Sequence, residues 1–403
     1  MKVAVFTPYL PYPPDTGGKT RSYHLLRALT ARFKVDLYTV YYGEGPSKEH
    51  VKALREHCRC QVVLFRLRKS CRTRDLVWRT LSPLPRVVDH FHTSYSLEQA
   101  RQHLCNGGYD VVVADEMCMT PYAELASGLP RVISRQKVDH AHYREVATAR
   151  PWGLEKVLDF IEATKLQRYE RAKMPLYQAC LACSEKDAQL IRRNAPEVPM
   201  VVIPNGVDLS TFVPSQRPES RCPTLLYVGA MDYYPNIDAV RFFFETMYEP
   251  LRQAVSNVRV QVVGHTPPTE IRQLAELPGV EVTGSVPDVR PYYERATVFI
   301  VPLRLGGGTR LKIVEAMAMG LPIVSTTIGV DGLDIRPGEN ILIADDPASF
   351  IEAVLKLLKD TDLHNRIAGG GQVLAHRYDW TTLTRPYVDL VEDVAEQWRR
   401  TSK

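Results

Sequence analysis

One stretch of the sequence joins a buried-strand pattern, a glycine run and a helix pattern, and it constrains the fold more than any other. Residues 298–303 are β-branched and apolar, three glycines follow at 306–308, and a second apolar run begins at Ile323. Between the glycines and that run lies a helix-like segment, for which Gly320 and Pro322 make a good stop. Strand, glycine loop, helix and strand in this order predict one crossover of a parallel sheet.

The glycine run is suited to holding an anion. Gly306, Gly307 and Gly308 can adopt positive φ, and they let backbone N–H groups approach a ligand closely. Thr309 is the expected N-cap of the helix, so these amides and the positive end of the helix dipole point into one small volume. A tight turn without a ligand is the alternative.

Two cations follow the glycines. Arg310 and Lys312 are expected in the first helical turn, where each opposes the helix dipole by about 0.3–1 kcal/mol. A bound phosphate or pyrophosphate would compensate for this, and two solvated charges are the alternative. The Lys-Ser or Lys-Thr pair of an ATPase P-loop does not follow the glycines, which excludes that class.

The segment GGGTRLKIVEAMAMGLPIVST (306–326) resembles the donor-binding loop and helix of GT-B glycosyltransferases, in particular the retaining family usually called family 4. The resemblance implies that the loop holds the pyrophosphate and sugar of a nucleotide-sugar, and that Glu315 holds the ribose hydroxyls. The commoner motif has two glutamates eight positions apart. Gly307 stands at the first of these positions, which leaves the donor sugar open.

The length of 403 residues suits two domains of about 150–200 residues each. Strand and helix patterns alternate in both halves, and an Asn-Gly turn at 205–206 precedes a segment rich in proline and serine. With the resemblance, these features predict an α/β protein with two Rossmann-like domains (GT-B) facing across a cleft. We expect an acceptor-binding domain at 1–204, a donor-binding domain at 205–384, and a C-terminal helix at 385–403 that crosses back to the first domain.

Composition indicates an ordinary globular protein, with 45% hydrophobic and 24% charged residues. The net charge of +5 is small, and no stripe of interleaved basic and aromatic residues suggests nucleic acid. No apolar run of 18 residues predicts a membrane span, and the N-terminus reads as a first strand, so we expect a cytoplasmic protein. The cysteines at 58, 60, 180 and 183 lack matching ligand pairs and predict no zinc site.

A basic stretch lies at residues 59–86. It holds eight lysine and arginine residues and one acid, with Trp78 and several aliphatic residues among them. Such a stretch fits peripheral contact with the cytoplasmic face of an inner membrane. A solvated face of the first domain is the alternative.

The first half also contains site candidates. Gly17 and Gly18 follow the first strand and precede a helix expected from about residue 20 to 32, and the resemblance places this loop beneath the reacting sugar. A tight turn is the alternative. Family members commonly carry a histidine after the strand that here ends near Ser134. The alignment puts Gln136 at that position, so either Gln136 and Asp139 take the catalytic role or the alignment is shifted.

In the second half, the family's usual arginine and lysine phosphate ligands are absent from the segment after Gly229, which contains Asn236 as a donor-binding candidate. The positive charge should therefore come from Arg310 and Lys312, with Arg304 as an addition. The resemblance further implies that the segment around Val286 and Pro287 receives the nucleotide base.

Acidic pairs at 345–346 and at 360 and 362 are the candidates for a divalent cation. GT-B enzymes generally need no metal, because the helix dipole and basic side chains neutralise the leaving diphosphate. We therefore expect no metal and no other cofactor.

These features together predict a retaining hexosyltransferase (EC 2.4 type). It would move a sugar from a UDP- or GDP-type donor to a lipid-linked, saccharide or small-molecule acceptor, in the synthesis of cell-surface polysaccharide, glycolipid or glycoconjugate. Catalysis would be mainly electrostatic, with Arg310 and Lys312 stabilising the departing diphosphate. The alternatives are a sugar-nucleotide epimerase of the same fold, a dinucleotide-dependent oxidoreductase, for which the G-x-G-x-x-G pattern is missing, and a non-catalytic nucleotide-sugar sensor.

Overall fold

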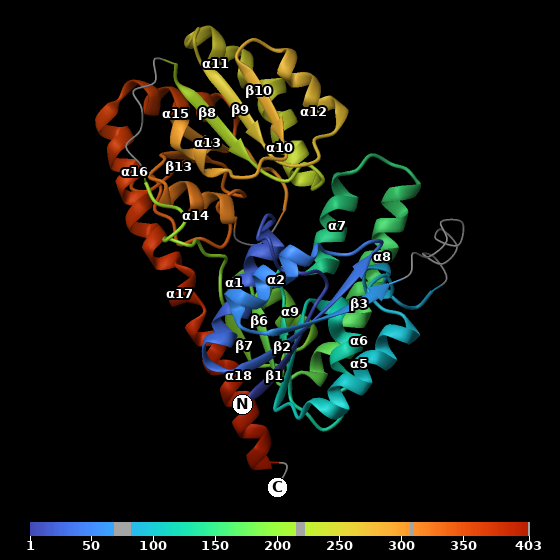
Figure 1. Cartoon of the computed structure of the whole chain (residues 1–403). Coiled ribbons are helices and arrows are strands. Elements are labelled where there is room, and N and C mark those ends of the chain that lie inside the picture. Colours follow the sequence, from blue (N-terminus) through green and yellow to red (C-terminus); the bar gives the residue numbers. More distant parts are fainter. Residues whose placement is uncertain (68–81, 215–221, 307–309, 402–403) are drawn as a thin grey trace. The chain divides into compact units, whose positions relative to one another are not determined.

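The chain divides into two compact units in a computed structural model that describes residues 1–67, 82–214, 222–306 and 310–401. Unit 1 comprises Met1–Pro204 together with Thr384–Lys403, and unit 2 comprises Asn205–Leu383. Both units consist of parallel strands alternating with helices, and both are seen in Figure 1. This confirms the α/β class with two Rossmann-like parts. Thr384, which we placed at the end of the donor domain, belongs to unit 1.

Unit 1 is built on a seven-stranded parallel sheet in the order β3-β2-β1-β4-β5-β6-β7. Strand β1 pairs with β2 on one side and with β4 on the other, so the strand order reverses between β1 and β4. Ligands of doubly wound sheets bind outside the carboxyl ends of the strands at such a reversal. The strands are β1 (Lys2–Thr7), β2 (Lys34–Tyr42), β3 (Gln61–Leu67), β4 (Val111–Asp115), β5 (Arg131–Ser134), β6 (Ala179–Ala182) and β7 (Met200–Val202).

Helices cover both faces of this sheet, as expected for a chain that returns to a parallel strand after each crossover. The described helices of unit 1 are α1 (Gly17–Arg32), α2 (Lys48–Cys58), α4 (Arg86–Asp89), α5 (Ser94–Gly107), α6 (Thr120–Ala123), α7 (Asp139–Ala149), α8 (Leu154–Lys173), α9 (Glu185–Asn194) and α18 (Arg385–Thr401), with short 3₁₀ turns η2 (Met117–Met119) and η3 (Met174–Leu176).

The C-terminal helix α18 packs on unit 1, as Figure 1 shows in red. Arg399 Nη2 lies 2.6 Å from Asp110 Oδ1, and Trp398 Nε1 donates a hydrogen bond to the Gly128 carbonyl at 3.0 Å. Tyr387, Val391 and Ala395 recur on one side of the helix and are buried. The apolar side of α18 is therefore buried against unit 1, and the last residues of the chain belong to this unit.

Unit 2 is built on a six-stranded parallel sheet in the order β10-β9-β8-β11-β12-β13. The predicted crossover is confirmed, since β11 and β12 are parallel neighbours joined through α14. The elements are β8 (Thr224–Val228), α10 (Tyr234–Thr246), α11 (Tyr248–Ala254), β9 (Arg259–Val263), α12 (Thr269–Gln273), η4 (Leu274–Glu276), β10 (Val280–Gly284), α13 (Arg290–Arg295), β11 (Val298–Val301), α14 (Leu311–Ala318), β12 (Ile323–Ser325), β13 (Leu342–Ile343), α15 (Pro347–Lys359), α16 (Thr361–Ala375), η5 (His376–Tyr378) and α17 (Trp380–Leu383).

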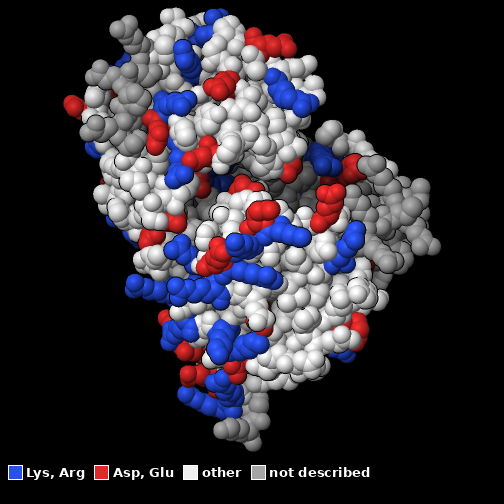
Figure 2. Space-filling view, in the orientation of Figure 1, with Lys and Arg blue, Asp and Glu red and all other residues white. Residues whose placement is uncertain are grey.

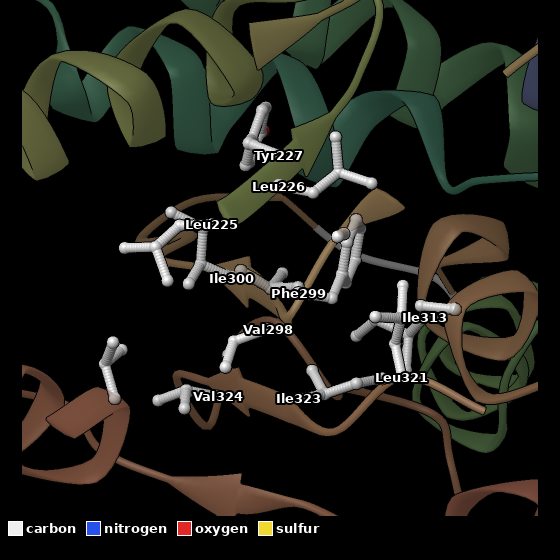
Figure 3. Packing of buried hydrophobic residues seen from close by; sticks show 14 of the residues in the cluster. Leu225, Leu226, Tyr227, Val298, Phe299, Ile300, Ile313, Leu321, Ile323 and Val324 are labelled. Carbon is white, nitrogen blue, oxygen red and sulfur yellow. The ribbon is translucent and has the colours of Figure 1, made fainter. Parts of the chain in front are cut away.

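The central strands of unit 2 are apolar on both faces because helices cover both (Figure 3). Leu225 and Leu226 of β8 lie beside Val298 to Ile300 of β11, and Ile313 anchors α14 to the same cluster. Each of these side chains is at most 1% exposed. Removal of this apolar surface from water, at about 25 cal/mol per Å², holds α14 against the sheet.

One acid of each pair that we considered for a metal acts as a helix cap. Asp346 Oδ1 accepts a hydrogen bond from Ser349 N at 3.0 Å and caps α15. Asp360 Oδ1 accepts one from Leu363 N at 2.9 Å and caps α16. Within the described residues, no group of three or more histidine, cysteine or acidic side chains is arranged to hold a metal ion.

Surface charges of both signs are interspersed on the face shown in Figure 2, in keeping with the net charge of +5. In the described part of the chain no helix is both long enough and apolar enough to cross a membrane. Half of the basic stretch that we predicted to contact a membrane, including Trp78 and five of its eight basic residues, falls at 68–81 and lies outside the described residues. That expectation stays a prediction.

Candidate functional site

The loop after β11 brings two cationic side chains to the start of α14. Gly306 has a φ of +102°, a conformation that favours glycine, and a Cβ there would lie 2.9 Å from Arg310 Nη2. Helix α14 begins at Leu311 with Arg310 at the N-cap, so our placement of Thr309 at the cap and Arg310 in the first turn is wrong. Gly307, Gly308 and Thr309 themselves lie outside the described residues.

Lys312 reaches from α14 to the end of β8. Its Nζ donates hydrogen bonds to Tyr227 Oη at 3.0 Å and to Asn236 Oδ1 at 2.9 Å, and it lies 4.2 Å from the centre of the Tyr227 ring. A Cβ on Gly229 would lie 2.9 Å from the same Nζ, so only glycine leaves room for the ammonium there. Lys312 thus supplies a cation beside the segment in which the family's usual basic residues are missing.

Tyr227 and Asn236 fix the position of this ammonium. Tyr227 Oη donates to Asn236 Oδ1 at 2.8 Å, while Asn236 Nδ2 donates to the Ala230 carbonyl at 2.8 Å. The two acceptors of Lys312 are therefore neutral, and burial lowers the pKa of Lys312 well below its usual value. The charge of Arg310 lowers it further, and Glu315 acts in the opposite direction more weakly. An anion bound here would raise this pKa and favour the protonated form.

Glu315 lies one turn further along α14. Its Oε2 accepts a hydrogen bond from the buried Tyr293 hydroxyl at 3.0 Å. Burial raises the pKa of Glu315 to about 7, although Tyr293 and Lys312 both favour the ionised form. Tyr293 belongs to α13, directly after the segment that we expect to receive the base. In that segment Val286 packs against the core and Pro287 is exposed.

Arg304 differs from Lys312 because its charge is matched within unit 2. Its Nε lies 3.1 Å from Asp238 Oδ2 and its Nη2 lies 2.6 Å from Asp238 Oδ1. Its guanidinium also lies 4.2 Å from the centre of the Phe242 ring. A paired, stacked arginine is a weaker candidate for a phosphate ligand, and its place in the donor site stays a prediction.

In unit 1 the two predicted glycines open helix α1 instead of forming a turn before it. Gly17 and Gly18 are its first two residues, with Thr16 as the N-cap, so the helix begins about three residues earlier than predicted. A Cβ on Gly18 would lie 2.4 Å from Tyr9 Oη and 2.9 Å from Gln136 Oε1. Gly18 is therefore required for close packing around Gln136.

Gln136 is held by its neighbours at the reversal of the strand order. Its Nε2 donates to Tyr9 Oη and Ser22 Oγ, both at 3.1 Å, and approaches the Gly18 carbonyl at 3.4 Å. Its backbone N–H donates to Glu116 Oε1 at 2.7 Å. Gln136, Gly18 and the carboxyl end of β4 therefore meet at one place.

Asp139 belongs to a buried cluster of charges. Arg135 is fully buried and lies 3.1 Å from Glu170, 3.4 Å from Asp139 and 3.7 Å from Glu116, measured between the charged atoms. Burial, together with the charge of Asp139, raises the pKa of Glu116 to about 8. For Glu170 burial acts to raise the pKa, but Arg135 and hydrogen bonds from His140 and Asn194 outweigh it and hold the pKa at about 2.

Several of these residues were not singled out as site candidates from the sequence. Tyr227 lies in an apolar strand, and Tyr293 lies in a short segment without clear periodicity, so both resemble ordinary core tyrosines. Arg135 and Glu116 follow the ends of β5 and β4 directly. Charged residues at the carboxyl ends of two adjacent parallel strands are the one signal that could have indicated this cluster.

The fold and the two sites define a class of protein. It is an α/β protein of two units, each with polar groups at the carboxyl ends of its parallel strands. The comparisons agree. The family model described as Glycosyltransferase Family 4 matches residues 16–211, and the one described as Glycosyl transferases group 1 matches residues 222–360. These two matches cover most of the chain, which belongs to the GT-B glycosyltransferases of family 4 (group 1).

Solved structures share the fold along the whole chain. The sucrose-phosphate synthase of Thermosynechococcus elongatus has a TM-score of 0.72 and 17% identity, with 98% of this chain and 99% of that chain covered. The Anabaena HepE protein, solved in complex with UDP and glucose, has a TM-score of 0.69 and 13% identity, with 97% and 99% covered.

A similar protein with a printed function is the phosphatidyl-myo-inositol mannosyltransferase of Mycobacterium tuberculosis, which is 26% identical over 211 residues. The match covers 48% of this chain and 54% of the mannosyltransferase. The chain thus spans about half the length of the curated relatives that it matches.

Proposed function

We propose that this protein transfers a hexosyl group from a nucleotide-sugar donor of the UDP or GDP type to an acceptor, with retention of the anomeric configuration. One observation carries the proposal. The ammonium of Lys312 is held by two neutral groups beside Arg310, at the start of α14, and Glu315 follows one turn later. This arrangement fits a diphosphate followed by a ribose.

In this proposal, the loop from Gly306 to Lys312 binds the two phosphates and the Glu315 carboxylate accepts hydrogen bonds from the ribose hydroxyls. The base lies near Val286 and Pro287. A protein of the same fold was solved with UDP and glucose, which supports a nucleoside diphosphate as the ligand class. Charge that develops on the departing diphosphate is stabilised by Arg310, Lys312 and the helix N-terminus, and no metal is required for this step.

The acceptor is proposed to bind unit 1, with Gln136 and Asp139 in the catalytic roles. Gln136 has no basic group, so it orients the acceptor hydroxyl, and an oxygen of the donor phosphate takes the proton. The mannosyltransferase relative is named for a phosphatidyl-inositol acceptor, which supports a lipid-linked, saccharide or small-molecule acceptor here. We accordingly propose a role in cell-surface polysaccharide, glycolipid or glycoconjugate synthesis, at the cytoplasmic face of a membrane.

The test is an NMR assay of the purified protein with UDP- and GDP-sugars in the absence of acceptor. Slow release of nucleotide, with the first free sugar in the anomeric form of the donor, supports a retaining transferase. Conversion of the donor into an epimer would support the epimerase alternative instead. Binding without any turnover, even with acceptors added, would indicate a nucleotide-sugar sensor.

The role of Gln136 is tested in the same assay. We expect Gln136→Ala to lower turnover at saturating donor while leaving the dissociation constant of the nucleotide unchanged, because the residue lies in unit 1. Turnover equal to that of the wild type would show that the alignment with the family's histidine position is wrong.

A further inference from the structure

The turn between α7 and α8 carries an unusual group of exposed apolar side chains. Trp152 is 87% exposed, Leu154 62%, Val157 45% and Phe160 38%, and all four fall within residues 152–160. Leu154 and Val157 are spaced three residues apart on α8, so they share one side of the helix. Figure 1 shows that this turn lies at the far end of a helical hairpin, away from the sheet of unit 1.

The turn is held in a defined conformation. Lys156 Nζ donates to the carbonyls of Arg150 at 2.9 Å and Thr148 at 3.3 Å, which are at the end of α7. The same ammonium lies 5.3 Å from the centre of the Trp152 ring. Trp152 is thus presented on an ordered turn, which lowers the entropy that a binding partner would have to overcome.

Most acidic side chains of α8 face the protein interior, whereas its basic side chains face outward. The acids Asp159, Glu162 and Glu170 are at most 5% exposed. Asp159 pairs with Arg150 at 3.2 Å, and Glu162 accepts a hydrogen bond from Val87 N at 3.3 Å. These acids therefore do not belong to a solvated face. They face the interior because each has a polar partner there.

The basic side chains of α8 have the opposite placement. Arg168 and Arg171 are exposed and Lys165 is half-buried, whereas Glu155 is the exposed acid of the helix and lies 3.8 Å from Arg150. The outward side of α8 therefore carries apolar side chains at its N-terminal end and positive charge along the rest. Aliphatic and tryptophan side chains enter the boundary between headgroups and acyl chains, and basic side chains bind anionic headgroups.

We propose that this surface, formed by Trp152, Leu154, Val157, Phe160, Arg168 and Arg171, binds an anionic lipid bilayer. The proposal uses neither the basic stretch at 59–86 nor the transfer reaction, so it stands or fails separately from the proposed function. A second copy of the chain or a protein partner would fit the apolar end, but it would give no reason for burying three acids and exposing the arginines.

The test is sedimentation of the full-length protein with vesicles of phosphatidylcholine, alone or mixed with phosphatidylglycerol. We expect binding to the mixed vesicles that weakens as salt is added, and little binding to the neutral ones. Trp152→Ala should weaken the partition coefficient about tenfold. Arg168→Gln and Arg171→Gln should each weaken it about fivefold.

Matched controls are available on helix α5 of the same unit. Tyr95 is a 69% exposed aromatic residue and Arg101 is an exposed arginine, so Tyr95→Ala and Arg101→Gln should bind as the wild type does. Urea unfolding measured for every variant reports that each one is folded. Equal binding of the wild type, Trp152→Ala and Arg168→Gln to the mixed vesicles overturns the proposal. So does a Trp152→Ala variant whose only change is a loss of self-association in solution.

Discussion

Two cations, a fully buried one in unit 1 and a half-buried one in unit 2, are surrounded in opposite ways. Arg135 in unit 1 lies within 3.7 Å of carboxylate oxygens from three acids. Lys312 in unit 2 is bonded to a phenol and an amide, both neutral. The first cation is compensated by the protein itself. The second is compensated only in part, through the more distant Glu315.

This difference distinguishes a cation that stabilises the fold from a cation that is suited to binding an anionic ligand. A buried ion surrounded by counter-ions holds several elements together, and here Arg135 joins β5, α7 and α8 through its partners. A desolvated ammonium whose pKa is lowered is destabilised in its charged form. A bound anionic ligand would stabilise that form. The comparison therefore predicts that Arg135 governs stability and that Lys312 governs nucleotide affinity.

The largest expected effect is that of Arg135→Met. Removing the guanidinium leaves three acidic side chains close together in the interior without a counter-ion, which should destabilise the protein by about 3–5 kcal/mol. The measurement is the free energy of unfolding in urea. Arg32→Met is the control, since Arg32 pairs with Asp389 at the surface and should contribute at most about 1 kcal/mol. Equal effects of the two substitutions would contradict the structural role of Arg135.

The next largest effect is that of Lys312→Met, which should act on binding. Loss of a charged hydrogen-bond donor to phosphate is expected to cost about 1.5–3 kcal/mol, or about 10- to 100-fold in the dissociation constant of the nucleoside diphosphate. The free energy of unfolding should stay the same or increase, because a desolvated ammonium is removed. Isothermal titration calorimetry and urea unfolding measure the two quantities.

Lys356→Met is the matched control for this substitution. Lys356 lies on the surface of α15 in the same unit and pairs with Glu352 at 2.8 Å. Neither affinity nor stability should change in this variant. A Lys312→Met protein that binds nucleotide normally, or that loses as much stability as Arg135→Met, would remove the distinction between the two cations.

A smaller effect is expected for Glu315→Gln, and it should depend on the ligand. The amide accepts weaker hydrogen bonds from ribose than the carboxylate does, so the affinity for the nucleoside diphosphate should fall about tenfold. Inorganic pyrophosphate lacks ribose, and its affinity should not fall. A parallel loss for both ligands would show that Glu315 acts on the phosphate site instead.

The smallest expected signal is a proton exchanged on binding. The lowered pKa of Lys312 implies that nucleoside diphosphate binding protonates this amine, so up to one proton is taken up and affinity falls as the pH rises. Ribose binding favours ionised Glu315. Because the pKa of Glu315 is about 7, ribose binding should release a proton at pH values near and below 7. Uptake by Lys312 and release by Glu315 oppose each other, so the net number of protons exchanged should vary with pH.

Calorimetry in buffers with different ionisation enthalpies gives the number of protons. Lys312→Met should abolish the uptake and leave the release near pH 7, whereas Glu315→Gln should do the reverse. Proton exchange that is the same in both variants would place the titrating group elsewhere.

The parts of this account that are local in sequence could be predicted from it. The crossover from β11 through α14 to β12 follows from an apolar run, a glycine loop and a helix stop that are contiguous in the chain. The expected role of Glu315 rests on a motif that is continuous with these glycines, and it stays a prediction. The start of α14 was misplaced, since Arg310 occupies the N-cap with extended backbone and no capping hydrogen bond from its side chain, which leaves no cap signal in the sequence.

The parts that depend on distant residues could not be predicted. Lys312 meets Tyr227 and Asn236, which precede it by 85 and 76 residues, and no periodicity links them. Arg135 meets Glu170 across 35 residues, on a helix whose acids and bases alternate too regularly to show which side is buried. Such contacts follow from the packing of the sheet and its helices, not from any local pattern.

The central claim is that unit 2 binds a nucleoside diphosphate through Lys312 and Glu315. Its most direct test is a thermal-shift measurement with UDP, GDP, ADP and TDP on the wild type, Lys312→Met and Glu315→Gln. A ligand at 100 times its dissociation constant stabilises the folded state by about 2.7 kcal/mol. We expect one nucleotide to raise the midpoint of the wild type selectively, and we expect a smaller shift in both variants. No shift with any nucleotide, or the same shift in all three proteins, would contradict the claim.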